Sequence, residues 1–171
     1  MHPPHHDFGK LNLHAPTALV RFAFLIGDWQ GEAKLKSATG DWQTFHVTWQ
    51  GRFILDGYAI ADEYRMTSLS GDLIVLGENF RTCDAATQTW HIRWLNALTG
   101  TWTNLVSEEF GGVTFEDKSI SYAFKEPVAD HPYTRATYTN ISKTHFTWKG
   151  DQSADGKTWS EFMIVDVDRT I

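Results

Sequence analysis

The sequence has little of what marks secreted, membrane-spanning or nucleic-acid-binding proteins. Among 171 residues there is one cysteine, Cys83, so no internal disulfide can form. No apolar run approaches the ~20 residues of a membrane span, and the polar first fourteen residues contain no hydrophobic region of a signal peptide. Lys and Arg are scattered singly and the net charge is −6, a balance that repels nucleic acid. We therefore expect a cytoplasmic protein with no nucleic-acid partner and no membrane span.

Tryptophan, in contrast, is abundant. The chain has 8 Trp, and aromatic residues make up 14% of it. Such an excess suits either an aromatic-lined pocket or a β-rich core. The length fits one compact domain. We expect a flexible N-terminal arm over residues 1–14 and a single domain over residues 15–171.

One short helix is followed by strand after strand. Thr17 can cap a helix in which Leu19, Phe22 and either Leu25 or Ile26 share one face, and Gly27 ends it. The strand-like segments are Trp29–Lys36, Trp42–Gln50, Phe53–Met66, Leu73–Arg81, Thr89–Ala97, Thr101–Glu108, Val113–Phe124, Thr134–Asn140, His145–Gly150 and Trp159–Asp168. Short strands joined by tight turns predict an all-β fold, an antiparallel up-and-down β-barrel of about 8–10 strands. The helix would plug one end, and closure would leave no sheet edge.

Several segments resemble a known class of barrels. The run from Gly27 to Gly31, with Trp29 at its centre, resembles the first-strand signature of the calycins, the lipocalin-like and fatty-acid-binding barrels. Further segments resemble a bacterial family of lipocalin-like domains of unknown function: residues 55–62, Phe80-Arg81 with Asp84, and residues 90–96, 146–150 and 153–159. Ala97 departs from that family, which usually has proline there. The resemblance implies a barrel with a cavity, no agreed activity, and an Arg169 that stacks on Trp29.

Alternation along the strands indicates which side chains face a cavity. On Thr89–Ala97 the inward set is Trp90, Ile92, Trp94 and Asn96. Asn96 would either orient a ligand by hydrogen bonding or satisfy a backbone group at the barrel rim. The same alternation makes Tyr122, Tyr138 and Trp148 candidate pocket walls, although core packing explains them equally well.

The orientation of Arg81 depends on the length of the loop that follows its strand. A three-residue loop, Ala85–Thr87, pairs Arg81 with His91 and turns it outward. A four-residue loop that starts at Asp84 pairs Arg81 with Trp90 and turns it inward. Inside, Arg81 could stack on Trp90 or bind an anionic ligand. Outside, it would form a surface or rim salt bridge.

Two carboxylates are candidate catalytic groups. Asp62 shares a strand face with Ile60 and Tyr64, and Glu161 lies on a similarly apolar face. If buried, such a carboxyl has a raised pKa and can act as a general acid or base. The competing explanation is an ion pair with an arginine such as Arg81 or Arg52.

These observations support two functional hypotheses. The first is binding of a hydrophobic or aromatic small molecule in the barrel. The alternative is a cofactor-free isomerase, cyclase or lyase that uses Asp62 or Glu161. No two histidines have zinc-ligand spacing, and alternation turns His46, His91 and His145 outward, so we expect no metal and no cofactor. A homodimer formed through exposed apolar strand faces is a further hypothesis.

Overall fold

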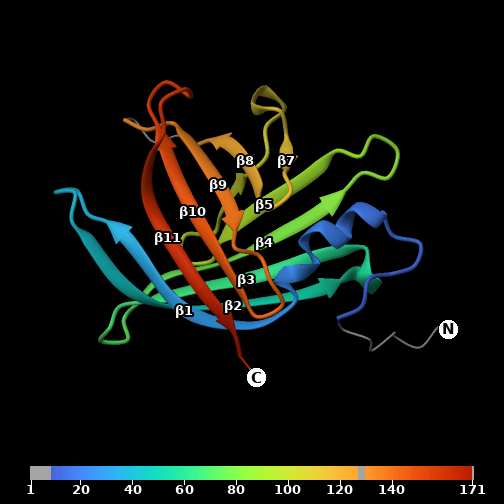
Figure 1. Ribbon diagram of the computed structural model, residues 1–171, viewed down its shortest axis with the longest axis horizontal. Coiled ribbons are helices and arrows are strands. Elements are labelled where there is room, and N and C mark those ends of the chain that lie inside the picture. Colours follow the sequence, from blue (N-terminus) through green and yellow to red (C-terminus); the bar gives the residue numbers. More distant parts are fainter. Residues whose placement is uncertain (1–8, 127–129, 171) are drawn as a thin grey trace.

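The computed structural model describes residues 9–126 and 130–170. In this part of the chain eleven strands form one antiparallel sheet that curls strongly into a half-barrel (Figure 1). The strands are β1 Gly27–Lys36, β2 Trp42–Ile54, β3 Ala59–Thr67, β4 Leu73–Cys83, β5 Trp90–Asn96, β6 Thr101–Asn104, β7 Val113–Phe115, β8 Ile120–Lys125, β9 Tyr133–Thr139, β10 His145–Ser153 and β11 Ser160–Arg169. Three short 3-10 helices complete it: η1 Thr17–Leu25, η2 Leu55–Gly57 and η3 Glu108–Phe110. The predicted all-β antiparallel class is confirmed.

The sheet is built from two meanders. Strands β1 to β6 pair in sequence order, strands β7 to β11 do the same, and β1 pairs with β11 to join the two. The order therefore ends at β6 and β7, which do not pair with each other within the described residues. This is the up-and-down arrangement that the turn pattern predicts. The predicted closure is wrong, because the described sheet has two edges, at β6 and β7.

A tight turn divides one segment that the sequence suggested was a single strand, Phe53–Met66. The three residues Leu55–Gly57 all have positive φ, at 52°, 54° and 82°, so they reverse the chain between β2 and β3. Gly57 also has no room for a Cβ, which would overlap the backbone of the N-terminal segment. The dipeptide Asp56-Gly57 is a strong hairpin signal. A similar reversal divides Val113–Phe124 into β7 and β8, which raises the strand count.

The N-terminal segment lies against this turn. We predicted a flexible arm over residues 1–14, of which residues 1–8 lie outside the described part of the chain. Beyond residue 8, the backbone N–H of Asn12 donates to the carbonyl of Gly57 at 3.2 Å. The side chain of Leu13, in contrast, is 97% exposed.

Helix η1 covers one end of the half-barrel, where it contacts β2, β3 and β4 (Figure 1). The predicted apolar face is confirmed, because Leu19, Phe22 and Leu25 are fully buried. The predicted cap is wrong: Thr17 is the first helical residue, the N-cap is Pro16, and no side chain bonds to the helix start. Burial of one face, not capping, therefore holds this helix in place.

Trp29 and Arg169 meet beneath the helix, as the calycin resemblance implies. They are direct partners in the pairing of β1 with β11, and the Arg169 Cζ lies 4.1 Å from the centre of the Trp29 ring. The indole N–H of Trp29 donates to the Leu25 carbonyl at 3.0 Å. Arg169 donates from Nη1 to the Ile26 carbonyl at 2.7 Å. One contact thus ties the first strand, the last strand and the helix end together.

Candidate functional site

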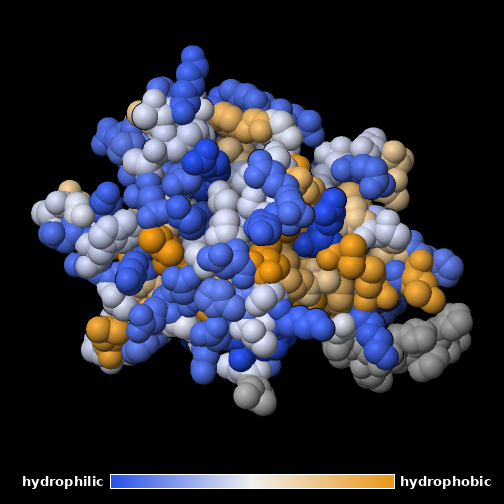
Figure 2. Space-filling view, in the orientation of Figure 1, coloured by the Kyte–Doolittle hydropathy of each residue, from blue (hydrophilic) through white to orange (hydrophobic). Residues whose placement is uncertain are grey.

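A cavity of about 330 Å³ lies inside the half-barrel, between the two meanders. This volume is at the lower end of the range for small-molecule sites, roughly 300–1,000 Å³. Its aromatic walls include Trp49, Tyr64, Trp94, Phe124, Trp148 and Phe162. The face of the molecule in Figure 2 is mostly hydrophilic, with apolar residues in separate patches. The residues that line the cavity are, in contrast, mostly apolar.

A buried ion pair lies next to the cavity, at its helix-covered end. Asp62 on β3 and Arg81 on β4 are both 0% exposed. Arg81 donates from Nε to Asp62 Oδ1 at 2.6 Å and from Nη2 to Asp62 Oδ2 at 3.1 Å, a two-point contact. Burial alone would lower the pKa of Arg81, but the adjacent Asp62 carboxylate holds it well above its usual range. The positive charge of Arg81 and the negative charge of Asp62 therefore cancel, and the pair has no net charge.

Neighbouring polar groups complete this network. The Asp62 carboxylate also accepts from the Trp49 indole N–H at 3.0 Å and from the Asn79 amide at 2.7 Å. Arg81 Nη2 donates to the Tyr138 hydroxyl at 2.9 Å. Burial raises the pKa of Tyr138 well above its ordinary value, against the opposing effect of Arg81, so this hydroxyl stays protonated.

The inward position of Arg81 results from a loop longer than either alternative considered from sequence. Arg81 pairs with Ile92, because the loop comprises the six residues 84–89. Both the three-residue and the four-residue loops are therefore wrong. The six-residue loop is two residues longer than the four-residue loop, and a shift of two residues keeps Arg81 on the same, inward face. Asp84 builds the extra length, since its Oδ1 accepts from the backbone N–H groups of Ala86 and Thr87, each at 2.8 Å.

We expect Asp84→Ala to lower the urea midpoint of unfolding at neutral pH but not in acid. Hydrogen bonds from the backbone of Thr87 and Ala86 lower the pKa of the Asp84 carboxyl. A lowered folded-state pKa gives stability that is present above the ordinary pKa of about 4 and is lost as the pH falls through the lowered value. Urea unfolding at pH 7 and in strong acid measures this.

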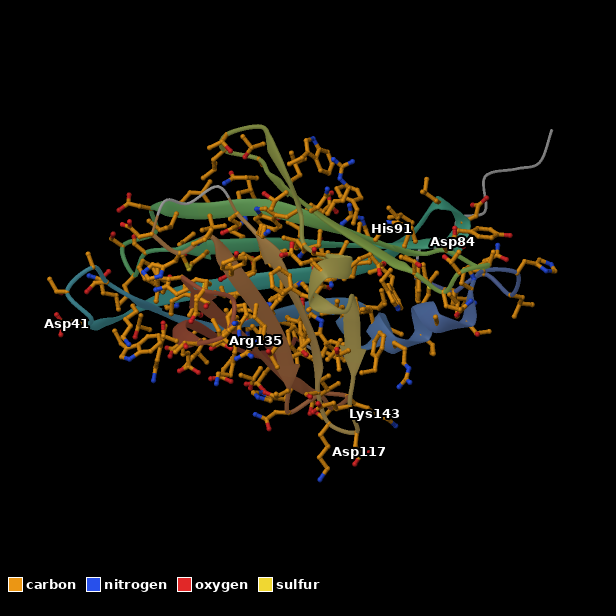
Figure 3. The ribbon with its side chains drawn as sticks, turned by 90° about the horizontal axis from the view of Figure 1, so that it is seen from above. Asp41, Asp84, His91, Asp117, Arg135 and Lys143 are labelled. Carbon is orange, nitrogen blue, oxygen red and sulfur yellow. The ribbon has the colours of Figure 1, made fainter. Side chains whose placement is uncertain are left out.

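Asp117→Ala is the matched control, because it removes an exposed carboxylate from the turn between β7 and β8. Asp84 and Asp117 both lie at the periphery of the molecule (Figure 3). An Asp84→Ala midpoint equal to that of the control at pH 7 would show that the turn does not depend on this carboxylate.

The aromatic residues proposed from alternation divide into two groups. Four residues named from sequence line the cavity: Trp94, Tyr122, Tyr138 and Trp148. Trp90 instead packs against Phe22 of the helix, with ring centres 4.9 Å apart, and is 7% exposed. Asn96 Oδ1 accepts from the Leu98 backbone N–H at 3.0 Å. Its side chain therefore satisfies a backbone group at the rim, the second of its two interpretations.

Two glycines within strands make room for the tryptophan walls. A Cβ on Gly77 would overlap the Trp94 ring, and one on Gly150 would lie 2.8 Å from both the Trp148 and the Phe162 rings. The aromatic rings thus lie against bare backbone. Sequence analysis missed both glycines, although an isolated glycine in a strand pattern signals a close approach of this kind.

Neither candidate catalytic carboxylate is a free group in the cavity. Asp62 is held by Arg81, and Glu161 on β11 forms an ion pair with Lys149. The carboxyl that does line the cavity is Glu126, which directly follows β8. Glu126 Oε2 accepts from Thr134 Oγ1 at 3.3 Å, and burial raises the pKa of the carboxyl. Glu126 falls between the predicted strands Val113–Phe124 and Thr134–Asn140, and the sequence patterns assigned it no role.

One wall hydroxyl lacks a partner. The hydroxyl oxygen of Tyr64 on β3 is buried and accepts or donates no hydrogen bond within the described residues. Burial raises the pKa of Tyr64, so the group stays protonated. An unpaired buried hydroxyl costs free energy.

The described residues contain neither a cluster of metal-ligating side chains nor a helix that could span a membrane. Among them, no three side chains of His, Cys, Asp or Glu lie close enough together to hold a metal ion. No helix in the same part of the chain has the length and apolarity to cross a membrane.

Comparison with known proteins gives the fold. The chain is similar to the crystal structure of Rv2717c from M. tuberculosis, with a TM-score of 0.66 and 11% sequence identity. The match covers 92% of this chain and 99% of that one. No family model and no curated protein matches the chain. At this identity the likeness is one of fold, and it extends over nearly the whole of both chains.

Proposed function

We propose that this chain binds a small apolar or aromatic molecule in the cavity of its half-barrel. The observation that carries the proposal is the cavity itself, about 330 Å³ and walled by aromatic rings from both meanders. Taking about 30 Å³ for each molecule of liquid water, the space corresponds to roughly eleven waters. Rigid aromatic walls provide a large contact area with little loss of side-chain entropy.

The surroundings of the cavity support a binding role. Helix η1 covers one end, and the neutral Asp62–Arg81 pair lies beneath the walls without presenting a net charge. Gly77 and Gly150 keep two tryptophan rings against the strand backbone, which leaves the interior open. A fold selected for packing alone would have filled this space with side chains.

We also propose that the chain is a calycin. The Gly27-to-Gly31 signature and the stacking of Arg169 on Trp29 support this assignment. The proposed acid–base alternative has less support, because both of its carboxylates, Asp62 and Glu161, are ion-paired.

We expect Trp94→Ala to weaken the binding of isopropylnaphthalene, a neutral apolar probe, by about tenfold. Truncation of a central aromatic wall typically costs 1–2 kcal/mol or more. Quenching of tryptophan fluorescence and isothermal titration calorimetry measure the affinity. Trp102→Ala is the control, because Trp102 is 50% exposed and lies outside the cavity lining. Absence of binding to the native chain, or equal losses in the two variants, would contradict the proposal.

A further inference from the structure

We infer that the ligand of this cavity is an organic cation, an amine or quaternary ammonium on an apolar or aromatic body, with its charged group beside Glu126. The inference rests on the proposed binding function and names the class of its ligand. Three features carry it: the charge balance of the cavity, the unpaired carboxylate at one end, and the aromatic walls.

The charge balance excludes an anionic ligand. Arg81 donates to Tyr138 of the cavity lining, and its charge is taken up by the two-point contact with Asp62. Among the described residues that line the cavity, Glu126 is the one with a formal charge at neutral pH. An anion in this space would therefore face a carboxylate and find no cation. A cation would find a partner and leave the buried pair undisturbed.

Glu126 has no cation of its own among the described residues. The adjacent Lys125 forms an ion pair with Glu109 at 2.9 Å, and Arg135 on β9 forms one with Asp151 at 2.8 Å. Among the described residues the Glu126 carboxylate accepts one hydrogen bond, from Thr134 Oγ1. A half-buried carboxylate with a single neutral donor still has lone pairs to offer a ligand.

The position of Glu126 suits a cation held against aromatic rings. The carboxyl lies at one end of a cavity whose walls include Phe124, Trp148 and Phe162. The faces of such rings attract ammonium groups, and the attraction rises when both partners are shielded from water. The carboxylate would bind the charge of the ammonium group, and the aromatic faces would contact the carbon atoms attached to it.

The spacing of two residues along β9 gives the length of the site between the Asp62–Arg81 pair and Glu126. Tyr138, which bonds to Arg81, and Thr134, which bonds to Glu126, are four residues apart on β9. At the rise of a β-strand this is about 13 Å. The ligand is therefore elongated, with its apolar end toward the Asp62–Arg81 pair and its cation at the other end.

Three probes of matched shape test the inference: naphthylethylamine, isopropylnaphthalene and naphthoate, which are cationic, neutral and anionic near neutral pH. Calorimetry on the full chain should rank them amine, then neutral probe, then naphthoate, with about tenfold between the first two. In Glu126→Gln the amine should lose that advantage, while the affinity for isopropylnaphthalene stays the same. Glu32→Gln, which removes an exposed carboxylate from β1, is the control and should leave the ranking unchanged.

Each failure has a separate meaning. If isopropylnaphthalene does not bind the native chain either, the proposed function fails. If it binds but the amine binds no better, or if Glu126→Gln leaves the preference for the amine intact, the inference of a cationic ligand is overturned and the proposed binding function stands. If naphthoate binds most tightly of the three probes, the inference of a cationic ligand is overturned as well.

Discussion

Replacing Arg81 with methionine is expected to lower the free energy of unfolding by about 3–5 kcal/mol, because the substitution leaves a buried carboxylate without its cation. Asp62 is 0% exposed, and its two remaining donors, Trp49 and Asn79, are neutral. The loss would also remove the hydrogen bond from Arg81 to Tyr138. Urea unfolding followed by tryptophan fluorescence measures the change.

Two further variants separate charge from packing. Arg52→Met breaks an ion pair with Glu78 in which the Arg52 side chain is 40% exposed, so it should cost no more than about 1 kcal/mol. The double variant Asp62→Leu with Arg81→Met should recover part of the loss, since no unpaired charge stays buried. Equal effects of Arg81→Met and Arg52→Met would show that the buried pair is not the source of stability assigned to it.

Trp29→Ala is expected to destabilise the protein by about 3–5 kcal/mol while leaving the affinity for isopropylnaphthalene unchanged. The Trp29 ring is 1% exposed, packs against Phe146 with ring centres 4.8 Å apart, and lies under Arg169. Its removal creates a cavity in the core and removes the hydrogen bond to the Leu25 carbonyl. Trp29 does not line the ligand cavity, so the two measurements should separate.

The control for this prediction is Trp42→Ala, which truncates a tryptophan that is 42% exposed at the start of β2. It should change the unfolding free energy far less. Arg169→Gln should cost about 1 kcal/mol from the lost cation–π contact, plus its backbone hydrogen bonds. A Trp29→Ala variant that keeps its stability but no longer binds the probe would reverse the assignment of Trp29 to the fold.

Alternation was enough to predict some of the site. A side-chain period of two placed Trp94 and Tyr138 on inward faces, and both line the cavity. The orientation of Arg81 could not be settled in this way, because it depends on the length of a loop that the Asp84 carboxylate extends. Loop length is set by a few hydrogen bonds, and one residue of error reverses a whole strand.

The ion-pair partners of charged residues could not be predicted from the sequence, for a different reason. Lys125 directly precedes Glu126 in the chain, yet it forms its ion pair with Glu109. Successive side chains on a strand point to opposite faces, so neighbours in sequence are not neighbours in space. That the Glu126 carboxylate has no cationic partner among the described residues is therefore a property of the fold, and the sequence carries no signal that could reveal it.

The joining of the two meanders has a consequence for how the chain reaches its native state. Every pair of adjacent strands in the sheet is also consecutive along the chain, except β1 with β11. Hairpins of consecutive strands close short loops, whereas β1 and β11 bring opposite ends of the chain together. The loop-closure entropy of folding is therefore concentrated in one pairing. The Trp29–Arg169 contact lies in that pairing, where its free energy offsets the entropy of joining the ends.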